Sequence, residues 1–114
     1  MPVIAITVDG YAGLPSQPAS ALVDSGADGT MIPIDLLEVI GALYEDTVNM
    51  RGVLGDSEPV DRYTVGIQIG PLTVRGIHAV AIPAGEGSVI GRDVLNFLAV
   101  TLNGPAHTTQ IEVD

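Results

Sequence analysis

Short apolar runs separated by turn residues make up most of the chain. The run over residues 2–8 stops at Asp9-Gly10, a dipeptide typical of hairpin turns. A Pro-, Ser- and Gln-containing stretch over 13–20 indicates a loop. Further strands are expected over residues 21–23, 47–54, 60–69, 72–82, 98–102 and 108–113. Many short strands at this spacing favour a sandwich or a barrel.

Two segments have helical periodicity instead. The segment 34–43 has apolar residues three and four positions apart, which is the spacing of one helix face. Pro33 stands just before it and Asp35 falls in its first turn, both favoured at helix starts. The second segment, 91–98, also has its apolar residues on one side. The turn residues 103–105 then lead into the last predicted strand.

The two halves of the chain share a weak internal repeat. In the first half, the apolar pair Leu22-Val23 precedes a glycine-containing loop and then a helical segment. In the second half, Val89-Ile90 precedes Gly91 and the second helix. Two such units facing each other would form a pseudo-twofold barrel.

Composition supports one folded, turn-rich unit. Of the 114 residues, 46 % are hydrophobic, enough for a packed core, and 14 glycines with 8 prolines argue against a helical bundle. No linker or low-complexity tract divides the chain, so one domain over 1–114 is expected. The absence of cysteine excludes disulfides and thiol catalysis.

The net charge and the N-terminal residues indicate which partners and which location to expect. Four arginines and no lysine stand against 14 acidic residues, which gives a net charge of −10. This charge repels phosphate backbones and anionic lipids, so neither a nucleic acid nor a membrane is an expected partner. The N-terminus has no basic region of the kind that begins a secretory signal. A cytoplasmic protein is therefore expected.

Asp24 is the strongest candidate for chemistry. It lies in the string A-L-V-D-S-G-A-D-G-T, between an apolar strand and a tight polar turn. A strand that ends at Val23 would deliver Asp24 to the barrel interior, where Ser25 supplies a short hydroxyl. Gly26 allows a positive φ or a close approach of the backbone to a partner. The same tripeptide is also compatible with an ordinary turn.

A second string, S-V-I-G-R-D-V-L, begins well downstream at Ser88. Together, ALVDSGAD and SVIGRDVL resemble the retropepsin-like aspartic proteases, a family that includes the retroviral proteases. The resemblance extends over nearly the whole chain. It implies an all-β fold, a small closed barrel of the acid protease type with one or two short helices. It further implies pseudo-twofold symmetry within the chain and a homodimer.

The resemblance also assigns roles to residues of both strings. Asp24 corresponds to the catalytic aspartate, and Ser25 to the hydroxyl residue that ties the two catalytic loops together across the dimer. Gly26 and Ala27 correspond to backbone that lines the cleft and hydrogen-bonds substrate. Asp28 corresponds to an acid that pairs with an arginine of the final helix and has a weaker role in substrate contact.

The arginine of the final helix is Arg92 in this chain, and Gly91 precedes it. The resemblance makes both residues structural supports of the catalytic loop. The alternative for Asp28 and Arg92 is a surface ion pair that contributes under about 1 kcal/mol to stability.

The family also has a β-hairpin flap that closes over the cleft, and residues 50–58 are its candidate here. Gly52 and Gly55 would make this segment flexible, while Val53 and Leu54 could contact a peptide. An ordinary hairpin loop is the alternative. The helix over 34–43 and the tail over 104–114 make this chain longer than the minimal retroviral pattern.

The chemistry implied by the resemblance needs two carboxylates within about 3 Å that share one proton. The chain has a single D-[ST]-G, so two copies of Asp24 would have to meet in a homodimer. The implied function is an aspartic endopeptidase that hydrolyses peptides or proteins without a metal or cofactor. His78 and His107 lack metal-ligand spacing. The alternative function is a non-catalytic peptide-binding or dimerisation module.

Overall fold

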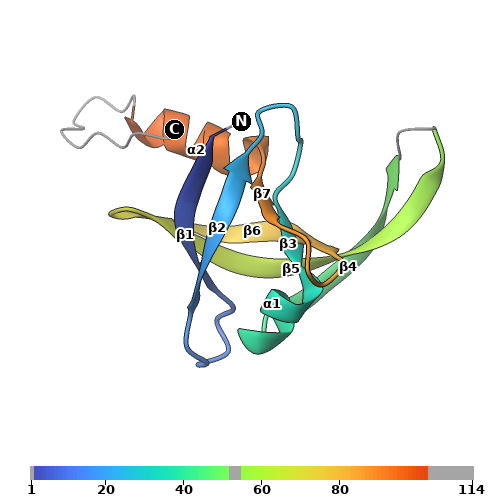
Figure 1. Ribbon diagram of the computed structural model, residues 1–114, viewed down its shortest axis with the longest axis horizontal. Coiled ribbons are helices and arrows are strands. Elements are labelled where there is room, and N and C mark those ends of the chain that lie inside the picture. Colours follow the sequence, from blue (N-terminus) through green and yellow to red (C-terminus); the bar gives the residue numbers. More distant parts are fainter. Residues whose placement is uncertain (1, 52–54, 103–114) are drawn as a thin grey trace.

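The strands form one sheet that closes on itself (Figure 1). This structure is a computed structural model that describes residues 2–51 and 55–102. Within these residues the elements follow the order β1 (Val3–Asp9), β2 (Gln17–Val23), β3 (Met31–Pro33), α1 (Ile34–Val39), β4 (Leu43–Arg51), β5 (Ser57–Ile69), β6 (Leu72–Ile82), β7 (Ser88–Ile90) and α2 (Arg92–Leu102).

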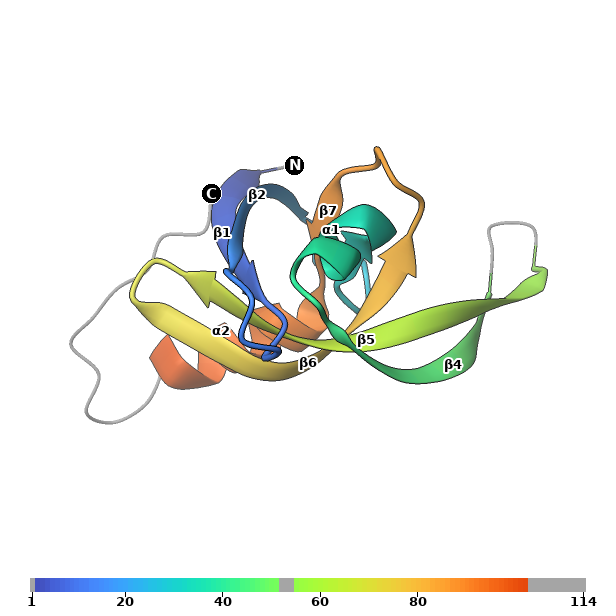
Figure 2. The same cartoon turned by 90° about the horizontal axis from the view of Figure 1, so that it is seen from below.

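The order of strands in the sheet explains the closure. Neighbouring strands run β1-β2-β7-β3-β6-β5-β4, and β1 also pairs with β5. Six strands therefore close into a barrel, and β4 lies outside the ring on the free side of β5. The hairpin of β4 and β5 projects away from the body of the barrel (Figure 2). The predicted all-β closed barrel with two short helices is confirmed.

The short strand β7 links the two halves of the chain. It runs parallel to β2, with Leu22 opposite Val89 and Val23 opposite Ile90. It also pairs antiparallel with β3 through Met31. The two apolar pairs of the internal repeat, Leu22-Val23 and Val89-Ile90, are thus direct neighbours in the sheet.

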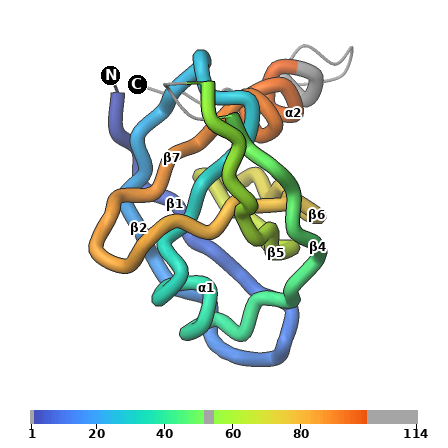
Figure 3. The backbone as a smooth tube through the Cα atoms, turned by 90° about the vertical axis from the view of Figure 1, so that its right-hand side faces the viewer, coloured from blue at the N-terminus to red at the C-terminus, as the bar shows by residue number. Residues whose placement is uncertain are grey.

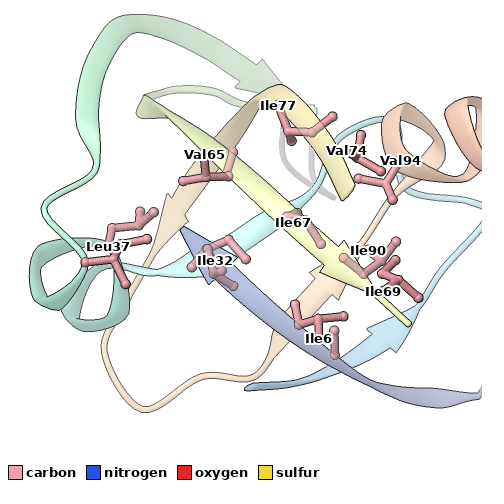
Figure 4. Packing of buried hydrophobic residues seen from close by; sticks show 14 of the residues in the cluster. Ile6, Ile32, Leu37, Val65, Ile67, Ile69, Val74, Ile77, Ile90 and Val94 are labelled. Atoms are coloured by element: carbon pink, nitrogen blue, oxygen red, sulfur yellow. The ribbon is translucent and has the colours of Figure 1, made fainter. Parts of the chain in front are cut away.

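Aliphatic side chains fill the barrel (Figure 4). Alternate residues of each strand point inward, so Ile6 and Val8 of β1 and Val65 and Ile67 of β5 are buried. The two helices close opposite ends of the barrel, with α1 at the lower end and α2 at the upper end (Figures 1 and 3). Because the chain has no Trp and one Phe, the core consists almost entirely of isoleucine, valine and leucine side chains.

The first helix begins where it was predicted but is shorter. It starts after Pro33 and has Asp35 in its first turn, yet it ends at Val39. Gly41 has a φ of 66°, a left-handed conformation that stops a helix and turns the chain into β4. Leu43, placed by the periodicity on the helix face, is instead the first residue of β4.

Two other expectations were wrong. Residues 98–102 were predicted as a strand, but they continue α2, because Leu98 joins Val94 on the buried face of that helix. Residues 13–20 were predicted as a loop, but β2 already begins at Gln17. Pro18 is tolerated there because β7 pairs only with residues 21–23, so this part of β2 is an edge on one side. The predicted turn over 103–105 and strand over 108–113 lie outside the described residues.

No helix in the described ranges is long and apolar enough to cross a membrane. The longer of the two helices, α2, has 11 residues.

Candidate active site

Asp24 is the first residue after β2, and backbone hydrogen bonds fix its position from two sides. The Asp24 N–H donates to the carbonyl of Ile90 over 3.0 Å, and the Val23 N–H donates to the carbonyl of Pro2 over 2.8 Å. The end of β2 is therefore held by β7 on one flank and by the N-terminal segment on the other. The backbone at such a doubly held strand end has little freedom to move.

The turn after Asp24 is built around its own carboxylate. The Gly26 N–H donates to Asp24 Oδ1 over 2.9 Å, and the Ala27 N–H donates to the Asp24 carbonyl over 3.1 Å. A Cβ atom on Gly26 would lie 3.2 Å from Asp24 Oδ1. Gly26 does not have a positive φ, so close approach is the reason for a glycine here. One carboxylate oxygen is thus oriented by the loop.

The outer side of this loop is exposed. Asp24 is half-buried, whereas Ser25 and Gly26 are exposed. The Ser25 hydroxyl makes no hydrogen bond with any described residue of the chain. The loop therefore presents a hydroxyl and backbone groups outward, beside a carboxylate that is held in place.

The start of α2 packs directly on the loop. The Arg92 N–H donates to the carbonyl of Ala27 over 2.8 Å, and the Arg92 guanidinium pairs with the carboxylate of Asp28. The side chains of Arg92 and Asp28 are 55 % and 87 % exposed, and exposed pairs contribute under about 1 kcal/mol. The backbone hydrogen bond and the packing of Gly91 therefore stabilise the contact between the loop and α2 more than the ion pair does.

Gly91 allows the helix and the loop to touch. A Cβ atom on Gly91 would lie 2.6 Å from both the carbonyl carbon and the carbonyl oxygen of Gly29. Real Cβ atoms do not come so close to backbone, so any side chain at position 91 would push the loop off the helix. The glycine is required by proximity and not by its φ angle.

Thr30 and Asp93 form a hydrogen-bonded network that the sequence analysis missed. Thr30 is fully buried, and its N–H and Oγ1 donate to the two carboxylate oxygens of Asp93 over 3.1 and 2.7 Å. Thr30 Oγ1 also accepts a hydrogen bond from the Gly91 N–H over 3.2 Å. The same Asp93 carboxylate accepts the Val94 N–H over 2.8 Å. One carboxylate therefore joins the end of the loop to the first turn of α2.

A weak signal for this network is present in the sequence. Asp93 is an acid in the first turn of a helix, where carboxylates stabilise free N–H groups. Thr30 stands in front of the apolar segment Met31–Pro33. Their contact spans 63 positions, and nothing in either local pattern pairs them.

The candidate flap lies on the projecting hairpin. Strands β4 and β5 pair continuously from Leu43 opposite Thr64 to Arg51 opposite Ser57, with one irregularity between residues 44 and 46. Gly55 has a φ of 85°. The three residues Gly52, Val53 and Leu54, expected to contact a peptide, lie outside the described residues.

Polar side chains brace the base of this hairpin. The Arg62 guanidinium donates to both carboxylate oxygens of Asp46, over 2.8 and 2.6 Å. These hydrogen bonds hold the pKa of Asp46 below its usual 3.8 and raise the pKa of Arg62. Next to this pair, the ring of Tyr44 packs edge-on against Tyr63, with centroids 5.8 Å apart.

The described residues contain no group of three or more His, Asp or Glu side chains that could hold a metal ion. His78 is exposed on β6, opposite Thr64. His107 lies outside the described residues.

Comparison with known proteins agrees with this geometry. A family model described as aspartyl protease matches residues 4–94. The structure of EIAV protease complexed with the inhibitor HBY-793 superimposes with a TM-score of 0.62 and 18 % sequence identity, covering 86 % of this chain and 88 % of that one. No curated protein matches significantly. The chain therefore belongs to the retropepsin-like aspartyl protease family.

Proposed function

We propose that the protein is an aspartic endopeptidase that acts as a homodimer, with Asp24 of each chain forming one catalytic pair. The observation that carries this proposal is the loop after β2, where Asp24 is fixed by β7 and oriented by the Gly26 N–H. The chain has one D-S-G, and this chemistry needs two carboxylates. The exposed outer side of the loop supports a twofold contact there.

The reaction follows from a pair that holds one proton in total. The charged carboxylate removes a proton from a water molecule, whose oxygen bonds to the carbonyl carbon of the peptide. The protonated carboxyl donates to the carbonyl oxygen, giving a tetrahedral intermediate. The pair then gives its proton to the amide nitrogen and the C–N bond breaks. A hydroxyl of the intermediate returns a proton to the pair as the carboxylic acid product forms, so the pair again holds one proton.

The neighbouring residues take supporting roles in this proposal. Ser25, whose hydroxyl makes no hydrogen bond with the described residues of its own chain, would bond the partner loop across the axis. Backbone groups of Gly26 and Ala27 would hold the peptide, and Asp28 would lie at the edge of the cleft. Gly91 and Arg92 support the loop from α2. The hairpin over 50–58 would cover the substrate.

Replacement of Asp24 by asparagine tests the proposal. Asp24→Asn keeps the side-chain oxygen that accepts the Gly26 N–H but cannot accept the proton of water. We expect peptide cleavage to fall by at least about 10³-fold, with the unfolding midpoint and the sedimentation coefficient unchanged. Asp35→Asn, on the exposed side of α1, makes the same change of charge and should cleave normally.

A wild-type protein that binds peptides without cleaving any member of a diverse peptide library would contradict the proposal. That result would favour a peptide-binding or dimerisation module.

A further inference from the structure

A cavity of about 360 Å³ lies on the outer side of β1, β5 and β6, beneath the loop that follows β1. It is separate from the Asp24 loop. Asp24 follows the end of β2 that pairs with Val3, whereas the cavity begins at Thr7 and Asp9, near the other end of β1. Strand geometry puts roughly 20 Å between these two ends. In Figure 1 the β1–β2 turn is at the bottom of the molecule and the end of β2 is at the top.

The floor of the cavity consists of outward-facing residues in two cross-strand rows. Thr7, Gln68 and Thr73 are direct neighbours across the three strands. The next row places Asp9 opposite Gly66, with Arg75 on β6 at the far side of the cavity. The floor therefore presents two hydroxyls and an amide, with a carboxylate and a guanidinium beside them.

Tyr11 forms a wall of the cavity, and several contacts hold it there. Its φ of 65° is unfavourable for a residue with a Cβ atom, and no other non-glycine residue in the described ranges has a positive φ. Its hydroxyl accepts the Gly76 N–H over 3.2 Å. Its ring occupies the space over Gly66, where a Cβ atom would come within 2.7 Å of the Tyr11 hydroxyl. Backbone strain held by such contacts is typical of functional sites.

The two charges of the cavity are not neutralised within the described part of the chain. Arg62 and Arg92 form ion pairs there, but Arg75 does not. The Arg75 guanidinium instead lies 6.0 Å from the centre of the Tyr11 ring. Asp9 accepts only a long hydrogen bond of 3.4 Å from the Tyr11 N–H. Arg51 also forms no ion pair within the described residues, so Arg75 is distinguished by its place at a cavity beside Asp9 and Tyr11.

We propose that this cavity binds a small zwitterion of the size of one or two amino acid residues. The carboxylate of the ligand would pair with Arg75, its ammonium group with Asp9, and its peptide or polar groups with Thr7, Gln68 and Thr73. Charge-assisted hydrogen bonds of this kind fix the orientation of small ligands. The volume is at the small end of ligand pockets. This site does not depend on the proposed protease activity.

An NMR titration of the ¹⁵N-labelled protein with glycylglycine at neutral pH tests the site. We expect saturable shifts at the amides of Tyr11, Gly66, Gln68 and Gly76. Arg75→Gln should weaken binding by about tenfold, because it removes the partner of the carboxylate. Glu86→Gln, in the exposed turn after β6, also removes one charge but lies outside the cavity, and it should bind like the wild type.

Two related probes test both ends of the ligand. Glycylglycine amide lacks the carboxylate and N-acetylglycylglycine lacks the ammonium group, so each should bind about tenfold more weakly than glycylglycine. Equal binding of all three probes would overturn the proposal. So would the absence of saturable shifts, or equal affinities of the Arg75→Gln and Glu86→Gln variants. Unchanged amide shifts away from the cavity would show that each variant is folded.

Discussion

Thr30 and Asp93 show how much of this site rests on residues outside the D-S-G motif. Every polar atom of Thr30 has a partner: its N–H and hydroxyl bond Asp93, its hydroxyl accepts from Gly91, and its carbonyl accepts the Val80 N–H over 2.9 Å. Buried polar groups need such partners, because an unpaired one is costly. The network therefore fixes where the loop ends and α2 begins.

Replacement of Thr30 by valine, which has nearly the same shape, removes only the hydroxyl. The Gly91 N–H and one Asp93 oxygen then lose a partner, so we expect the free energy of unfolding to fall by about 1–3 kcal/mol. Urea denaturation measures it. Thr64→Val, which removes an exposed hydrogen bond to Glu45, should change stability by less than about 0.5 kcal/mol. Equal urea midpoints for the two variants would mean that the network contributes nothing.

Gly91 gives a second prediction at the residue scale. Gly91→Ala puts a Cβ atom 2.6 Å from the backbone of Gly29, so we expect a loss of about 1–3 kcal/mol and weaker peptide cleavage. Gly87→Ala is the matched control, since nothing lies within 4 Å of the added atom. Thermal unfolding compares the two, and a Gly91→Ala protein as stable as the Gly87→Ala protein would contradict the close packing.

Single residues of the candidate site differ in how well the sequence predicted them. Asp24, Asp28 and Arg92 were predicted because the two short strings that contain them resemble a known family, and the structure shows the ion pair between Asp28 and Arg92. Thr30 ends the string A-L-V-D-S-G-A-D-G-T and Asp93 lies within S-V-I-G-R-D-V-L, yet the two residues are 63 positions apart and meet only in the folded chain. Contacts made by chain closure leave no local pattern, so sequence reasoning passed over them.

Strand β4 of the β4–β5 hairpin has no buried residue, and the contacts that brace it depend on pH. The pKa of Asp46 is lowered by the hydrogen bonds from Arg62. Because the pKa of Asp46 is lower in the folded than in the unfolded protein, the pair stabilises the hairpin at pH values above the usual pKa of 3.8. This contribution is lost as the pH falls through the folded-state pKa.

Hydrogen exchange of the hairpin amides, corrected for the intrinsic effect of pH, tests this dependence. We expect protection in β4 and β5 to fall below about pH 3.8 in the wild type, whereas in Asp46→Asn it should be lower than in the wild type at neutral pH and should lack this fall. Glu38→Gln, on the exposed face of α1, should follow the wild type. A wild-type hairpin with the same protection at neutral and low pH would refute the role of this pair.

The elements as a whole were predicted best where the apolar run was long. Strands β5 and β6 match the predicted apolar runs, which are long enough to stand out between turn residues. The region 98–102 was read as a strand because a short apolar run has no period of its own. In the structure this region is helical, and Leu98 and Val94 are both buried on one face of α2. The strand Met31–Pro33 was missed because three residues are too few for any periodicity.

At the scale of the whole molecule, periodicity alone left a sandwich and a barrel equally open. The resemblance of ALVDSGAD and SVIGRDVL to the retropepsin-like proteases favoured the closed barrel, and the pairing of β1 with β5 confirms it. The pairing of β2 with β7, which is part of the same ring of strands, also holds Asp24 at the end of β2. Fold and candidate site therefore depend on the same contacts.

The central claim is that two chains share one catalytic centre, and mixing wild type with Asp24→Asn tests it most directly. Once subunits have exchanged, equal amounts of the two chains leave about a quarter of the dimers with both carboxylates. We therefore predict that the activity per wild-type chain falls to about half of its unmixed value. Mixing with Asp35→Asn should cause no such fall. Activity that stays proportional to the wild-type chains alone, in a sample shown to exchange, would contradict the account.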